Sequence, residues 1–179
     1  MTKIISVALF AALFMHAFVA LGQSTSSPPG ADSELHAKLI GSWRLVSVET
    51  MRPNGEIITE WMGKAPTGLI VYLPNGLMSV QIMRDPRPAR FESGSRLKAS
   101  PEELKAAYLG YYAYWGKYTI SPSENMVIHD VESSLWPEEV GTIYKRFFSI
   151  EGSRLVLTTA PYKRGDEERR NRLVWERVP

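Results

Sequence analysis

The residues with the clearest chemical potential are a histidine and an arginine on neighbouring candidate strands. His129 lies in the middle of 126–135 and could serve as a hydrogen-bond donor or a general base if it is buried. Arg146 alternates with Tyr144 and Phe148 along 140–150. An arginine that points into a core needs a carboxylate or an anionic ligand. The pattern therefore supports either a structural pair of buried polar groups or a ligand site.

A catalytic role for His129 would require a second polar group. Asp130 cannot orient the imidazole directly, because adjacent residues of a strand face opposite sides of the sheet. A cross-strand partner is needed, and the available residues are Glu132, Arg146, Tyr118 and Glu49. The alternative function that follows is an isomerase or cyclase, with His129 as the base and Glu132 as a second catalytic candidate.

The composition excludes several kinds of chemistry. The 179-residue chain has no cysteine, so disulfides, thiolate metal sites and a cysteine nucleophile are ruled out. His36 and His129 are far apart in the sequence, and we expect neither a metal site nor a cofactor. A formal net charge of +2 does not favour nucleic acid as a partner.

The first 22 residues read as a secretory signal peptide. Lys3 precedes a largely apolar run over 4–21, and Ala20-Leu21-Gly22 is a small-x-small cleavage site. Cleavage after Gly22 predicts a secreted or periplasmic protein with no membrane association; the alternative is a membrane anchor. Residues 23–37 are predicted to form a flexible linker and a short helical turn, followed by one domain over 38–179.

The rest of the chain predicts an all-β domain with one helix. Ser100, Pro101 and Glu103 form a helix-start signature that includes a capping box. Short turns separate the strands, which favours antiparallel pairing. About nine strands are expected, at 41–50, 56–62, 67–73, 77–83, 113–121, 126–135, 140–150, 153–160 and 172–178, with a charged loop over 163–171.

An unusual number of aromatic residues follows the predicted helix start. Six of the eleven residues over 108–118 are tyrosine or tryptophan. They could pack the helix on a sheet or against a barrel end, or some of the phenols could line a ligand cavity.

We expect these strands to close into an antiparallel barrel of about 8–10 strands, because closure removes the exposed edges that promote aggregation. Such a barrel can hold one small ligand. A β-sandwich is the alternative, although the short links between strands argue against the crossovers of that fold.

Several stretches resemble the lipocalin-like domain family, a largely uncharacterised group with a calycin-type barrel. The resemblance covers about 39–178 and is carried by 39–46, 76–81, 87–91, 110–118, 129–134, 141–142 and 173–177. It implies that Trp43, in the sequence Gly41-Ser42-Trp43, seals one barrel end beneath an arginine of the last strand, either Arg172 or Arg177.

The expected barrel, its many aromatic residues and the scarcity of catalytic groups together predict a ligand pocket at the open barrel end opposite Trp43. The partner expected there is a small hydrophobic or amphipathic molecule, held without a cofactor in a non-enzymatic binding protein. A third interpretation, a protein that only docks to other proteins, rests on the basic loops 84–98 and 163–172. The residues predicted to line the pocket are Tyr72, Gln81, Tyr118, His129, Arg146 and Trp175.

Overall fold

The structure, a computed structural model of the whole chain, describes residues 31–59 and 61–179. The predicted signal peptide over 1–22 and residues 23–30 of the predicted linker lie outside the described residues. Within the described part, the helices are too short or too polar to cross a membrane.

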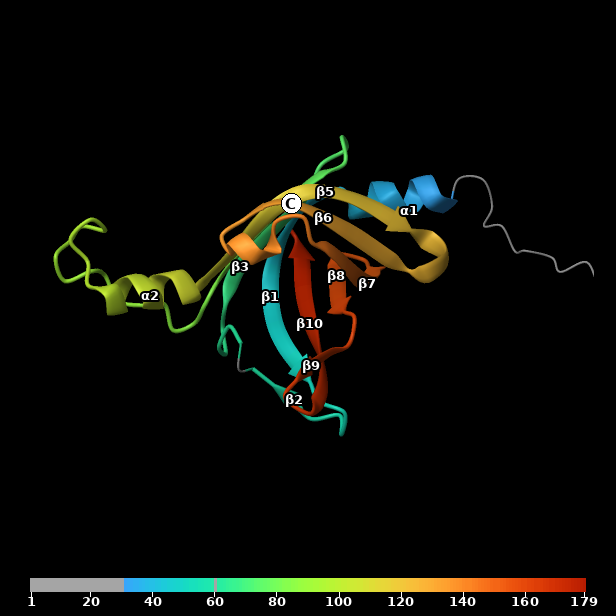
Figure 1. Cartoon of the computed structure of the whole chain (residues 1–179). Coiled ribbons are helices and arrows are strands. Elements are labelled where there is room, and N and C mark those ends of the chain that lie inside the picture. The colour runs from blue at the N-terminus through green and yellow to red at the C-terminus, as the bar shows by residue number, and fades with distance from the viewer. Residues whose placement is uncertain (1–30, 60) are drawn as a thin grey trace, which may run out of the picture.

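Eight antiparallel strands form a closed ring (Figure 1). They are β1 (Gly41–Met51), β3 (Thr67–Tyr72), β4 (Leu77–Met83), β5 (Tyr111–Ser121), β6 (Met126–Ser134), β7 (Ile143–Glu151), β8 (Arg154–Thr159) and β10 (Glu167–Arg177). Two shorter strands, β2 (Ile57–Ile58) and β9 (Tyr162–Arg164), extend the β1 and β10 ends. The helical elements are α1 (Ala31–Leu39), α2 (Pro101–Leu109) and the single turns η1 (Pro122–Glu124) and η2 (Pro137–Glu139).

The first and last ring strands pair with each other, which closes the barrel. Their register runs from Trp43 opposite Arg177 to Met51 opposite Arg170. The prediction of a closed antiparallel barrel is therefore confirmed, and the β-sandwich is excluded. Two expected elements need correction: the strand predicted over 56–62 contracts to β2, and the loop predicted over 163–171 is largely strand.

Trp43 seals one end of the barrel. Its side chain is fully buried, and its Nε1 donates a hydrogen bond of 2.9 Å to the carbonyl of Leu39 in α1. The Arg177 guanidinium lies 4.0 Å above the indole ring, a cation–π contact, and also donates to the carbonyls of Ile40 and Lys38. Gly41 has a φ of +132°, and a Cβ there would lie 2.7 Å from Arg177 Nη1. The Gly-x-Trp pattern thus leaves room for the arginine that covers the tryptophan.

Side chains alternate between the inside and the outside of the barrel along each strand, and the inward-facing set fills the interior. In β4, Met78, Val80 and Ile82 are buried, whereas Gln81 is exposed. In β6, Val127, His129 and Val131 point inward, and Asp130 lies on the outside. The barrel therefore has a continuous apolar interior with His129 embedded in it.

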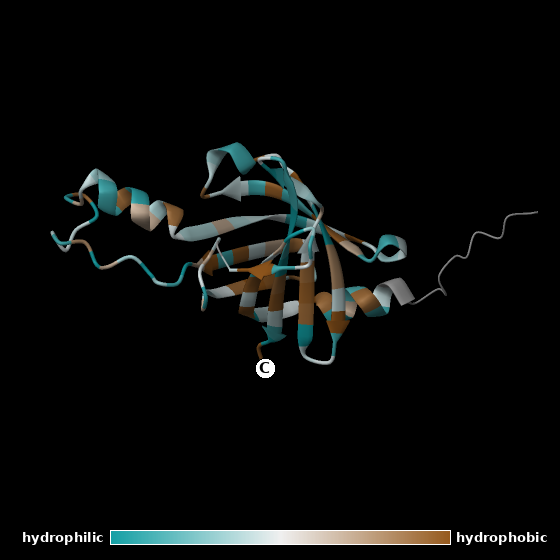
Figure 2. Ribbon diagram, turned by 90° about the horizontal axis from the view of Figure 1, so that it is seen from below, coloured by the Kyte–Doolittle hydropathy of each residue, from teal (hydrophilic) through white to brown (hydrophobic). Residues whose placement is uncertain are grey.

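Helix α2 begins as predicted but does not pack on the barrel. The Ser100 hydroxyl accepts a hydrogen bond from the Glu103 backbone, and the Glu103 carboxylate accepts one from the Ser100 backbone. None of its residues is buried, and both views show the helix extending away from the strands (Figures 1 and 2). The prediction that the helix packs its aromatics on a sheet or barrel end is wrong, because most of those aromatics belong to β5, which begins at Tyr111.

Candidate functional site

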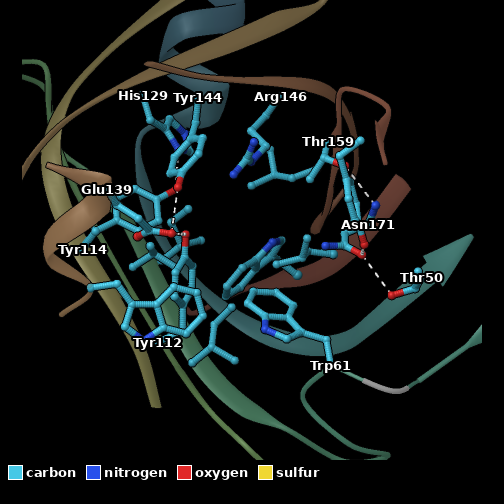
Figure 3. A pocket seen from close by; sticks show the side chains of 18 of the residues that line it. Thr50, Trp61, Tyr112, Tyr114, His129, Glu139, Tyr144, Arg146, Thr159 and Asn171 are labelled. Atoms are coloured by element: carbon cyan, nitrogen blue, oxygen red, sulfur yellow. Dashed lines mark hydrogen bonds between the residues drawn. The ribbon is translucent and has the colours of Figure 1, made fainter. Parts of the chain in front are cut away.

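A cavity of about 340 Å³ lies inside the barrel, at the end away from Trp43. This volume is within the range of small-molecule sites in proteins. Aromatic and aliphatic side chains make up most of its walls, and a few polar groups interrupt them (Figure 3). The lining residues are Thr50, Trp61, Ile70, Val80, Ile82, Tyr112, Tyr114, His129, Trp136, Glu139, Tyr144, Arg146, Leu157, Thr159, Tyr162, Arg164, Asn171, Leu173 and Trp175.

His129 is held by two tyrosines. Its Nε2 lies 2.9 Å from the Tyr72 hydroxyl, and its Nδ1 lies 2.8 Å from the Tyr114 hydroxyl. A neutral imidazole carries one N–H donor and one acceptor nitrogen, so one tyrosine donates to the ring and the other accepts from it. Both nitrogens are therefore used within the protein.

Burial keeps this group of side chains uncharged. Burial and the nearby positive charge of Arg146 lower the pKa of His129 from 6.5 to about 3. Burial likewise raises the pKa of Tyr114 to about 12 and that of Tyr72 well above its usual value. At neutral pH the imidazole and both phenols are neutral, so they contribute dipoles and no net charge.

The second polar group is a buried carboxylate, Glu139, at the end of η2. Its Oε1 accepts hydrogen bonds from the hydroxyls of Tyr144 at 2.7 Å and Tyr112 at 3.2 Å. Its Oε2 accepts one from the hydroxyl of Ser134 at 2.8 Å. Three hydroxyl donors therefore stabilise this carboxylate, as a buried charge requires. Burial also raises the pKa values of Tyr112 and Tyr144, which favours the neutral phenols that donate to it.

The third polar group lies on the opposite side of the cavity (Figure 3). The Asn171 Oδ1 accepts hydrogen bonds of 2.9 Å from the hydroxyls of Thr50 and Tyr162. Both of these bonds end on the oxygen of the Asn171 amide. They therefore leave the N–H groups of the amide nitrogen available as donors.

Arg146 lies on β7, and its positively charged side chain lines the cavity. Its guanidinium projects into the space between the Glu139 side and the Asn171 side (Figure 3). It lies 4.5 Å above the Tyr144 ring, and its Nη1 is 3.3 Å from the backbone carbonyl of Lys145. Within 31–59 and 61–179, no carboxylate lies within salt-bridge distance of Arg146.

The structure brings together three of the six side chains predicted to line the pocket: His129, Arg146 and Trp175. Tyr72 lies beyond the cavity wall and reaches it only through its bond to His129. Tyr118 is inside the barrel near the sealed end, where its hydroxyl donates to the Leu73 carbonyl and lies 3.2 Å from His36 Nε2.

Three other predicted positions are corrected. Gln81 is exposed on the outer face of β4, because Val80 and Ile82 occupy the inward face. Glu132 also faces outward and forms an ion pair of 3.2 Å with Lys117, so it cannot assist His129. Arg172 pairs with Glu49 on β1 at 3.2 Å, and Arg177 is the arginine that covers Trp43.

Sequence reasoning missed several residues at the cavity. Glu139 and Trp136 lie in or beside η2, and Trp61 lies in the connection between β2 and β3. Strand alternation does not extend to Trp136 and Glu139, so it could not assign them a side. Trp61 falls in the strand predicted over 56–62, which contracts to β2 and leaves Trp61 in the connection that follows. The sequence predicts a loop over 163–171 that includes Asn171, although its place in β10 follows the same inward alternation as Leu173 and Trp175.

An eight-stranded antiparallel barrel, sealed by a tryptophan at one end and hollow toward the other, defines a lipocalin-type architecture. The family model described as "Lipocalin-like domain" matches residues 40–178, and the chain belongs to that family.

One similar protein is the 4'-hydroxy-3'-methoxypropiophenone carrier protein ppsC of Aspergillus oryzae. It is 37% identical to this chain over 109 residues, which cover 97% of that relative and 57% of this chain. Together, the family and this relative support small-molecule binding as the general function of the chain.

Proposed function

We propose that the protein is an exported, non-enzymatic carrier that binds one small, partly aromatic molecule inside its barrel. The observation that carries this proposal is the cavity of about 340 Å³, with Trp61, Trp136 and Trp175 in its walls. Flat aromatic walls favour a flat apolar ligand, while a few polar groups fix its orientation. The relative named as a carrier of a hydroxy- and methoxy-substituted phenyl ketone supports a ligand of this size and character.

Filling the cavity is expected to abolish ligand binding without changing the fold. Val80 is buried on the inward face of β4 and lines the cavity. In Val80→Trp, the larger side chain would occupy space that the ligand needs, and we expect at least a tenfold loss of affinity. Isothermal titration calorimetry with 4'-hydroxy-3'-methoxypropiophenone as the probe measures the effect.

The matched control is Ser79→Trp on the same strand. Ser79 faces the outside of the barrel, so the added indole leaves the cavity unchanged. Its affinity should equal that of the unsubstituted protein, and circular dichroism should show both variants folded. Equal binding by Val80→Trp and Ser79→Trp would contradict a site inside the barrel.

Export rests on the signal peptide predicted over 1–22. We expect the protein from its natural source to begin at Gln23 and to occur outside the cytoplasm. Intact-mass measurement of that protein tests this part of the proposal. A mass that includes residues 1–22 would contradict cleavage.

An isomerase or cyclase that uses His129 as its base is the second candidate. The observation in its favour is that His129 lines the cavity beside its partner Tyr114. Two features favour the carrier: both ring nitrogens are engaged by tyrosines, and a pKa of about 3 makes His129 a weak base at neutral pH. Recovery of a bound ligand unchanged after incubation supports the carrier, and its conversion into an isomer supports the enzyme.

A further inference from the structure

Arg146 is the residue of the cavity that bears most directly on the charge of a ligand. This side chain points into the barrel, yet no carboxylate in the described part of the chain neutralises it. Its contacts include the face of the Tyr144 ring, the Lys145 carbonyl and the side chain of Tyr114. A guanidinium carries five N–H donors in a planar fork, so it can still bind a carboxylate or another negatively charged oxygen.

The carboxylate that lines the cavity is already satisfied. Glu139 accepts hydrogen bonds from Tyr112, Tyr144 and Ser134, which use both of its oxygens. Glu139 is therefore not the counter-ion of Arg146, and His129 is neutral. A guanidinium without a counter-charge in a partly desolvated cavity favours an anion.

The hydrogen-bonding capacity that remains in the cavity includes groups that can only donate. The Asn171 oxygen accepts from Thr50 and Tyr162, which leaves its amide N–H groups. Trp175 is fully buried in the cavity wall, and its Nε1 has no hydrogen-bond partner among the described residues. A ligand that complements these groups must itself be an acceptor.

We propose that the ligand is an aromatic monoanion, whose negatively charged oxygen binds the Arg146 guanidinium and whose ring packs among the tryptophans of the cavity. This inference rests on the proposed carrier function and adds the charge of the ligand to it. Aromatic carboxylates and phenolates share the required chemistry, because each carries a negatively charged oxygen close to an aromatic ring. A neutral ligand would leave Arg146 desolvated without a counter-charge.

The test compares probes that differ in charge and little in shape. The first pair is 2-naphthoate and its methyl ester, and the second is 4-nitrophenolate and 4-nitroanisole at pH 9. Calorimetric titration should give roughly ten- to a hundredfold tighter binding for the anion of at least one pair, as expected for a charge-assisted hydrogen bond. The pair that shows the larger preference identifies carboxylate or phenolate as the source of the charge.

Variants on adjacent positions of β7 assign the preference to one side chain. Arg146→Gln should lose the preference for the anion while it still binds the neutral probes, and Arg146→Lys should retain part of it. Lys145→Gln is the matched control, because Lys145 is also cationic but exposed on the outer face. It should behave like the unsubstituted protein. Circular dichroism and thermal unfolding establish that each variant is folded.

The outcomes separate this inference from the proposed function. Equal binding of charged and neutral probes, or a preference that survives in Arg146→Gln, would overturn the inference and leave the carrier intact. Failure of the unsubstituted protein to bind any of the four probes would overturn the inference, and failure to bind 4'-hydroxy-3'-methoxypropiophenone as well would overturn both.

Discussion

Replacing Trp43 with alanine is expected to lower the free energy of unfolding by about 3–5 kcal/mol. The side chain is fully buried at the sealed end, where it joins the core of the barrel to the carbonyl of Leu39. Its loss would leave a large cavity and remove the surface on which the Arg177 guanidinium lies. Urea denaturation followed by circular dichroism measures the change.

The control for this substitution is Trp115→Ala. Trp115 lies on β5, but its side chain faces outward and is 46% exposed. We expect a loss below about 1 kcal/mol, as for most surface substitutions. Similar losses in the two variants would argue that Trp43 does not seal the barrel.

Acid is expected to destabilise the protein through His129. Its pKa is about 3 in the folded protein and 6.5 in an unfolded chain. Because the folded pKa is the lower one, the unfolded state takes up the proton first as the pH falls below 6.5. Stability should therefore fall by up to about 1.4 kcal/mol per pH unit between about pH 6.5 and pH 3. The contribution of neutral His129 is fully present above that range.

The comparison that isolates this effect uses His129→Gln. Glutamine can donate and accept hydrogen bonds but does not titrate, so the variant should lose less stability between pH 7 and pH 4 than the unsubstituted protein. Denaturation curves at pH 7 and pH 4 give the loss of unfolding free energy for each of the two proteins. Equal losses would mean that His129 does not titrate with a lowered pKa.

Most of the barrel could be predicted from the sequence, because strand alternation and short turns are local features. The capping box at Ser100 likewise marked the start of α2. The position of α2 could not be predicted, because its aromatic stripe at Tyr108 runs into the strand that starts at Tyr111. The sequence shows where the aromatic side chains are. It does not show whether α2 or β5 places them in the core.

The candidate site was only partly predictable for a different reason. His129 and Arg146 could be selected because each is a polar residue amid apolar alternation on a strand. Glu139 follows Pro137 in a short turn, where no periodicity assigns its side chain to the interior. Its three hydroxyl partners come from β5, β6 and β7, and only the closed barrel brings those strands around it.

Pairing of β1 with β10 has a consequence for biosynthesis. A growing chain cannot complete the ring until Arg177 has been made, since that residue lies opposite Trp43. Every intermediate length leaves β1 with a free edge on that side, and the inner chamber has no finished wall. Folding to the native state must therefore follow synthesis of Arg177, and a small molecule can be enclosed only after that step.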